Sequence, residues 1–298
     1  MATVTAIAAG AWTANAATVW STGAVPEAGD AVALATFAVS MDMAATPALL
    51  SLTTAGAGQL TVDLTAGDFV INATTITGGS TTSPSGMIRI TGAAPAATCT
   101  INATTINHPA TSNAVSISHG STGTLIVNAT TVGGNAGASG AFGVENTSTG
   151  TVTITAAVNG ASNAAYSSAS GARNLSTGTL NVTGNCTGGA GTTSSAVHNT
   201  STGSISITGN LIGGTGNGAD GLANQKGTAT LSSCNITSGT GSIGYSGRPP
   251  TWTPAVSNYI KWGTTYFATQ KAATELKKGV VNGTITGTYD GGLFGATP

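Results

Sequence analysis

The fold is decided by one short stretch of sequence that recurs: Ser121-Thr122-Gly123-Thr124-Leu125, Ser148-Thr149-Gly150-Thr151-Val152, Ser176-Thr177-Gly178-Thr179-Leu180 and Ser201-Thr202-Gly203-Ser204-Ile205. The glycines of successive copies are 27, 28 and 25 residues apart, and Lys226-Gly227-Thr228 continues the series after 24 more. A period of this length indicates that one structural unit is stacked on itself along the chain.

Each unit contains several short apolar segments. The first alternates apolar and polar residues, as in Thr151-Val152-Thr153-Ile154-Thr155, which is typical of a β-strand with one buried face. A second follows at Ala156 to Val158, and a third around Val144 and the equivalent Val197. Three short strands per unit, with no room for a helix, predict one coil of a parallel β-helix. Between Leu60 and about Ile243 there is room for roughly seven coils at about 4.8 Å each.

Polar residues recur at the corner before each repeat glycine. Four residues before it, or three in the last copy, stand His119, Asn146, Asn174, Asn199 and Asn224. Stacked coils place such residues above one another, so we expect a side-chain ladder, in which asparagine amides can bond to the next coil and tolerate the left-handed turn conformation. The segments that begin at Asn72, Asn102 and Asn128 predict a second ladder.

Composition limits the class of protein. Of 298 residues, 6% are charged, 40% are hydrophobic and 44 are glycine. Disordered chains are polar and highly charged, so an ordered, narrow core is favoured. A net charge of −1 argues against nucleic-acid binding. The sequence shows no signal peptide and no apolar stretch long enough to span a membrane, so we expect no membrane insertion.

The two ends differ from the repeats and divide the chain into three parts. We expect an N-terminal cap with the first coils at 1–58, the β-helix at 59–248 and a small C-terminal module at 249–298. Trp12 and Trp20 are expected to plug the bottom of the helix. The C-terminal module follows Arg248-Pro249-Pro250 and is rich in aromatic residues. Its expected attachment or oligomerisation residues are Trp252, Tyr259, Trp262, Tyr266 and Phe267.

Both ends resemble those of tailed-phage virion proteins. The N-terminal stretch, with its two tryptophans and the turn Pro26-Glu27-Ala28-Gly29-Asp30, resembles the opening of many phage and bacterial right-handed β-helix proteins. The segment from Glu275 to Thr288, with its Gly279-Val280 and Thr286-Gly287-Thr288, looks like one found near the C-termini of phage structural proteins. The resemblance implies an all-β, right-handed parallel β-helix that works as a homotrimer, as a head fibre, capsid knob or tailspike. The repeat period alone does not show a trimer.

The sequence predicts no catalytic site. Glycoside hydrolysis needs two carboxyl groups about 5 to 10 Å apart. Between Pro84 and Gly247 only Glu145 and Asp220 are acidic, and they lie three coils apart, or about 14 Å along the axis. Asp63 and Asp68 bracket a turn without a neighbouring base. This separation applies within one chain, so a catalytic site formed by two subunits together stays an alternative.

No cofactor is expected either. The histidines are isolated, and Cys99, Cys186 and Cys234 lie far apart, so neither zinc-site spacing nor a disulfide framework is present. Cys99 and Cys186 stand where other repeats place leucine or valine and are expected to be core residues.

The leading hypothesis is therefore a non-enzymatic virion protein that decorates a phage capsid as a knob or head fibre. It would assemble in the host cytoplasm, reach the virion surface, attach to the major capsid protein or another virion protein through the C-terminal module or the N-terminal cap, and help host-surface adhesion. The alternative is a tailspike or tail-fibre receptor-binding protein that recognises host glycan. An enzyme is the third reading. Ice binding by outward threonines is a further one, which Asn128, Ser206 and Ser232 weaken by interrupting the threonine pattern.

Overall fold

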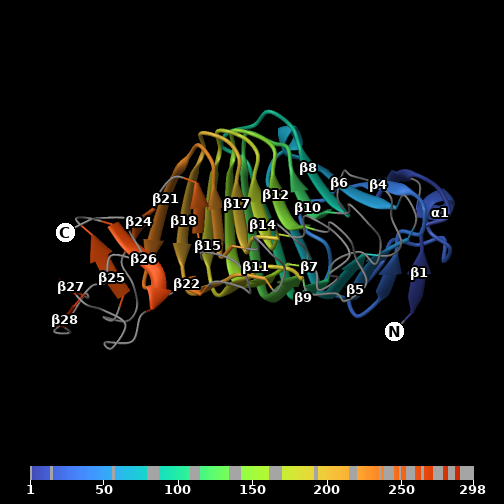
Figure 1. Cartoon of the computed structure of the whole chain (residues 1–298). Coiled ribbons are helices and arrows are strands. Elements are labelled where there is room, and N and C mark those ends of the chain that lie inside the picture. The colour runs from blue at the N-terminus through green and yellow to red at the C-terminus, as the bar shows by residue number, and fades with distance from the viewer. Residues whose placement is uncertain are drawn as a thin grey trace.

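Parallel strands stack in two sheets along the chain in the computed structural model (Figure 1). The structure describes residues 2–13, 16–55, 58–78, 87–107, 115–133, 142–160, 170–190, 194–214, 220–234, 236–237, 245–247, 250–252, 259–262, 265–270, 278–280 and 286–288. Side chains after Pro250, and those of 245–247, lie outside this description.

The first sheet contains one strand from nearly every coil. Its order is β1 (Thr3–Thr5), β3 (Ala31–Ala33), β5 (Leu49–Thr54), β7 (Phe69–Gly78), β9 (Thr98–Asn107), β11 (Thr124–Gly133), β13 (Thr151–Asn159), β15 (Thr179–Thr183), β18 (Ser204–Thr208), β21 (Thr228–Ser232) and β24 (Thr251–Trp252). Three short strands, β16 (Cys186–Thr187), β19 (Leu211–Ile212) and β22 (Ile236–Thr237), extend this sheet from β13.

The second sheet faces the first across the core. Its order is β2 (Gly10–Ala11), β4 (Ala38–Ser40), β6 (Gln59–Asp63), β8 (Ile88–Thr91), β10 (Val115–His119), β12 (Phe142–Asn146), β14 (Ala172–Asn174), β17 (Val197–Asn199), β20 (Leu222–Asn224) and β23 (Tyr245–Gly247). From β6 to β21 the chain passes through the second sheet and then the first sheet seven times, which matches the expected coil number. The predicted right-handed parallel β-helix is confirmed.

The expected three strands per coil are found only in the later coils. There the first sheet contributes a five-residue strand and a separate two-residue strand, as in β15 and β16. In β7, β9, β11 and β13 the two are joined into one strand of nine or ten residues. The register between β11 and β13 shifts after Asn128, so the long strands bend there without ending.

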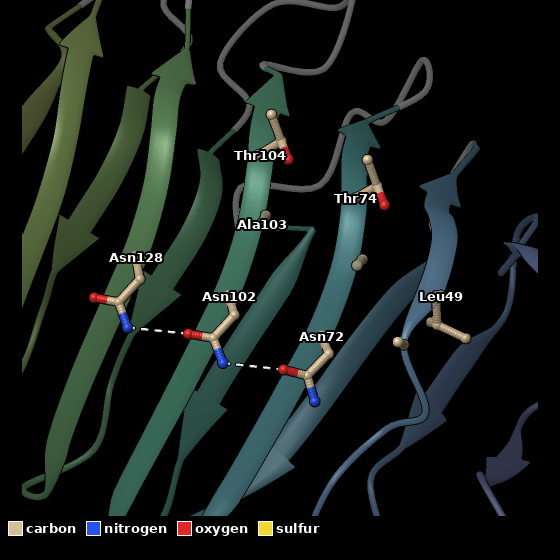
Figure 2. A pocket seen from close by; sticks show the side chains of 9 residues that line it. Leu49, Asn72, Thr74, Asn102, Ala103, Thr104 and Asn128 are labelled. Carbon is tan, nitrogen blue, oxygen red and sulfur yellow. Dashed lines mark hydrogen bonds between the residues drawn. The ribbon is translucent and has the colours of Figure 1, made fainter. Parts of the chain in front are cut away.

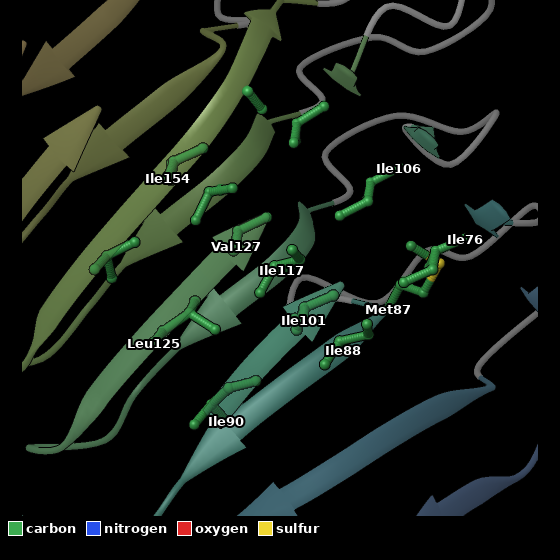
Figure 3. Packing of buried hydrophobic residues seen from close by; sticks show 14 of the residues in the cluster. Ile76, Met87, Ile88, Ile90, Ile101, Ile106, Ile117, Leu125, Val127 and Ile154 are labelled. Atoms are coloured by element: carbon green, nitrogen blue, oxygen red, sulfur yellow. The ribbon is translucent and has the colours of Figure 1, made fainter. Parts of the chain in front are cut away.

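The core is a column of aliphatic side chains between the sheets. Cys99, Leu125 and Val152 occupy equivalent positions on β9, β11 and β13, as do Ile101, Val127 and Ile154 (Figure 3). All six are fully buried. Since each coil repeats the same inward positions, the core is narrow and grows only along the axis.

The N-terminal segment belongs to the solenoid and also closes its end. Strand β1 pairs with β3 on one side. On the other side Ile7 N–H donates to Val19 O at 2.7 Å and Ser21 N–H donates to Thr5 O at 2.8 Å, next to the short helix α1 (Ala16–Val19). The free edge of β1 is therefore covered, which blocks pairing with another chain.

At the other end the strands become antiparallel. Strands β25 (Tyr259–Trp262) and β26 (Thr265–Gln270) pair with each other, as do β27 (Lys278–Val280) and β28 (Thr286–Thr288). Strand β26 lies next to β22 and β24 (Figure 1). Because β24 pairs with β21, the first sheet extends to Trp252, just past the expected boundary at residue 248.

Candidate functional site

The corner ladder lies inside the molecule. His119, Asn146, Asn174, Asn199 and Asn224 end the strands β10, β12, β14, β17 and β20, and they stack in register. All five have no solvent exposure. A buried amide must be hydrogen-bonded, so the identity of its partner determines what the ladder does.

Each ladder asparagine closes its own coil. The Nδ2 groups of Asn146, Asn174 and Asn199 donate to the carbonyl of the repeat glycine four residues ahead, at 3.0–3.1 Å. Asn224 does the same to Gly227 at 3.1 Å. Bonds to the next coil, which the sequence also led us to expect, are present as well: Asn199 Nδ2 donates to Asn224 Oδ1 at 3.0 Å and Asn146 Nδ2 donates to Thr179 O at 3.5 Å.

The ladder residues do not use the left-handed conformation that asparagine tolerates. Among the described residues, the non-glycine residues with positive φ are Ala35 and Ser233, and every ladder residue ends a strand with extended backbone. Asparagine suits this position because its side-chain N–H reaches the carbonyl of the repeat glycine in the interior. The ladder is therefore a structural element that fixes the Ser-Thr-Gly corner.

His119 is the one ladder position without an amide. Its Nε2 lies 3.1 Å from Gly123 O, and because a carbonyl oxygen only accepts, Nε2 carries a proton and is the donor. Its Nδ1 is buried without a partner. Burial lowers the pKa of His119 to about 4, partly offset by the bond to Gly123.

We predict that His119 makes the protein sensitive to acid. The unfolded chain takes up a proton near pH 6.5, whereas the folded chain does so near pH 4. Stability is therefore full above pH 6.5 and declines as the pH falls towards 4. At pH 5 the loss is about 2 kcal/mol. His119→Asn restores the ladder amide and removes this loss.

Urea unfolding of both proteins at pH 8 and pH 5 measures the effect. The difference in unfolding free energy between the two pH values is expected to be about 2 kcal/mol smaller for His119→Asn. His198→Asn removes the other histidine whose pKa is lowered, so it measures how much of the acid sensitivity comes from His198. Parallel pH profiles for wild type and His119→Asn would show that His119 is not the acid-sensitive group.

The carboxylates do not form a catalytic pair. Glu145 on β12 and Asp220, just before β20, are separated by β14 and β17 in the second sheet. Glu145 is buried and forms an ion pair with Arg173 on the adjacent strand β14. The guanidinium also lies over the Phe142 ring, 3.4 Å from its centroid. Glu145 is therefore held as a structural anion.

This Arg173 cluster was missed by the sequence analysis, although a signal was present. Glu145, Arg173 and His198 each immediately precede a ladder asparagine, so they stack on three adjacent strands. Burial, and to a smaller extent the charge of Arg173, lowers the pKa of His198.

Asp63 and Asp68 have local structural roles. Asp63 caps the 3-10 helix Leu64–Ala66 by accepting from Thr65 N–H at 3.0 Å, and the Thr65 hydroxyl and backbone hydrogen bonds lower its pKa. Asp68 accepts from Thr98 N–H of the next coil at 2.7 Å. Both carboxylates thus accept hydrogen bonds from the backbone, and neither of these contacts involves a second acidic side chain.

The three cysteines are core residues, as the sequence predicts for Cys99 and Cys186. Cys99, Cys186 and Cys234 are buried free thiols whose pKa burial raises to about 12. The described part of the chain contains no group of three or more His, Cys, Asp or Glu side chains that could hold a metal ion. It also contains no helix long and apolar enough to cross a membrane. His108 lies outside the described residues.

The expected caps and attachment residues lie at opposite ends. Trp12 and Trp20 are fully buried at the N-terminal end, with ring centroids 5.0 Å apart in an edge-on arrangement. Trp20 Nε1 donates to Trp12 O at 2.9 Å. Trp252 lies in β24, Tyr259 and Trp262 in β25, and Tyr266 and Phe267 in β26, but their side chains are outside the described set.

The second asparagine ladder lies on the outside and borders an open groove. Asn102 Nδ2 donates to Asn72 Oδ1 and Asn128 Nδ2 donates to Asn102 Oδ1, both at 3.0 Å (Figure 2). The groove has a volume of about 370 Å³ and also contacts Thr74 and Thr104. This ladder does connect successive coils, as expected of it.

No protein-family model, curated protein sequence or solved structure matches the chain.

Proposed function

We propose that this chain is a non-enzymatic structural protein of a tailed-phage virion, a capsid knob or head fibre that acts as a homotrimer. The main observation in its support is the buried corner. In each coil from β12 to β20, the side-chain amide of the ladder asparagine donates a hydrogen bond to the carbonyl of the repeat glycine. Such a solenoid is a rigid projection. The assignment to a phage particle is supported by the resemblance of both ends of the sequence to phage virion proteins.

The distribution of charge supports a role without catalysis. In the body of the helix, Glu145 is neutralised by Arg173, and Asp220 lies just before β20, which is three strands from β12 in the second sheet. Hydrolysis of a glycan needs two carboxyl groups that flank one bond. The repeats thus serve as a spacer, and the dissimilar C-terminal strands β25 to β28 are the proposed attachment element.

Fractionation of particles tests the virion assignment. Phage particles from a host that carries the gene are banded by density and probed with an antibody against the chain. The chain is expected in the particle band, and light scattering of the purified protein is expected to give three times the chain mass of 28.6 kDa. A chain that stays with the unassembled host proteins, or a stable monomer, would contradict the proposal.

Incubation with host surface polysaccharide tests the absence of catalysis. The chain length of the polysaccharide is expected to stay constant with wild type and with the matched variants Glu145→Gln and Asp220→Asn. If wild type shortened the polysaccharide and either variant abolished the effect, the protein would be an enzyme.

A further inference from the structure

The outer groove lies where three long strands bend. It runs across β7, β9 and β11, with Asn72, Asn102 and Asn128 along one side (Figure 2). Thr74 and Thr104, two residues further along the strands, line the other side, and the small side chains Ala73 and Ala103 lie between. Its volume of about 370 Å³ falls within the range of small-molecule sites.

The amides of the groove form a directed chain. Asn72 Nδ2 donates to Thr46 O at 3.2 Å, and each later Nδ2 donates to the Oδ1 of the preceding coil. A primary amide has two N–H groups and two oxygen lone pairs. Each of these bonds uses one N–H, so the ladder orients the amides and leaves further donors and acceptors beside the groove.

The lining selects against charged ligands. None of the nine residues in contact with the groove is acidic, basic or aromatic. An anion would require a cationic partner, and a metal cation would require oxygen ligands that include carboxylates. Hydroxyl groups, which both donate and accept, match neutral amides and threonines.

The regular spacing of the repeats favours a polymeric ligand with repeated hydrogen-bonding groups of its own. In the lining, an asparagine recurs on each of the three coils and a threonine on two of them, with about 4.8 Å between coils, so equivalent hydrogen-bonding groups follow one another along the helix axis. An extended peptide could not add as a strand here, because β7, β9 and β11 are paired on both sides.

We propose that this groove binds a neutral, hydroxyl-rich oligosaccharide that lies along the helix axis. The asparagine side contacts its hydroxyl groups, and Ala73 and Ala103 leave room for the sugar rings. Because the lining provides no aromatic platform, affinity is low, with a Kd of about 1 mM.

Saturation-transfer NMR and titration with hexasaccharides test this proposal. The probes are maltohexaose, cellohexaose and mannohexaose, with hexagalacturonate as the charged probe of equal length. At least one neutral probe is expected to bind wild type with a Kd of about 1 mM, and more tightly than the charged probe does. Thr104→Trp, at an exposed rim position, fills the groove and is expected to weaken binding at least about tenfold.

Thr208→Trp places the same ring on an exposed position of the same sheet outside the groove and is the matched control. It is expected to bind like wild type, and melting curves check that both variants fold. The proposal fails if no neutral probe binds at about 10 mM, if hexagalacturonate is preferred, or if Thr104→Trp binds like wild type. A change of oligomeric state in Thr104→Trp would instead assign the groove to a contact between protein chains.

The outcome is independent of the virion assignment. Particle association of wild type is measured without glycan, so the groove proposal can fail while the chain still bands with particles, and the reverse also holds.

Discussion

Replacing Gly178 by alanine is expected to destabilise the β-helix by about 3 kcal/mol or more. A Cβ atom there would lie 2.4 Å from both Gly150 O and Ser148 O, and 2.6 Å from Asn146 Nδ2. All three atoms belong to the preceding coil, and two of them, Gly150 O and Asn146 Nδ2, are joined by the ladder bond. The two coils must therefore separate locally, which lengthens the hydrogen bonds between β13 and β15.

Gly120→Ala is the matched control for this substitution. Gly120 lies just before a copy of the same corner, but its Cβ would meet Ile90 O at 3.4 Å and Thr147 Oγ1 at 3.5 Å, which is ordinary contact. Urea unfolding is expected to show a change within about 1 kcal/mol for Gly120→Ala. Equal effects of the two substitutions would show that close stacking at the corner does not limit stability.

Removing Trp20 is expected to cost about 3 to 5 kcal/mol. The ring is fully buried against Trp12, and its Nε1–H is the donor to Trp12 O. Trp20→Ala leaves a cavity and an unsatisfied carbonyl at the end of the solenoid. Since the segment around Trp20 also covers β1, we further expect aggregation through the exposed strand edge.

Denaturant unfolding and light scattering separate these two effects. Trp20→Phe keeps most of the ring but loses the N–H donor, so it is expected to lose only about 1 to 3 kcal/mol and to remain soluble. If Trp20→Ala unfolded at the same urea concentration as wild type, the tryptophan pair would not be a structural cap.

The repeat made most of the fold predictable from sequence. Period and alternation give the coil number and the inward positions, such as Leu125 and Val127, because every coil must present the same face to the core. The bend at Asn128 was not predictable in the same way. Whether two strand segments join or separate depends on backbone pairing between coils, which residue types alone do not specify.

The two asparagine ladders show where sequence reasoning stops. Both have the same residue type and a similar period, yet Asn174 is fully buried and Asn128 is exposed. The difference depends on which side of the strand faces the core. The pairing of Glu145 with Arg173 could have been read from their positions before Asn146 and Asn174, because stacked coils bring equivalent positions together.

The measurement that tests the account most directly is an electron cryomicroscopy map of an intact particle carrying the chain. The account predicts threefold density on the capsid surface, in which three copies of the β-helix project outward, with β25 to β28 at the attached end and the Trp12–Trp20 end free. Density confined to the tail, or a particle without this chain, would contradict it.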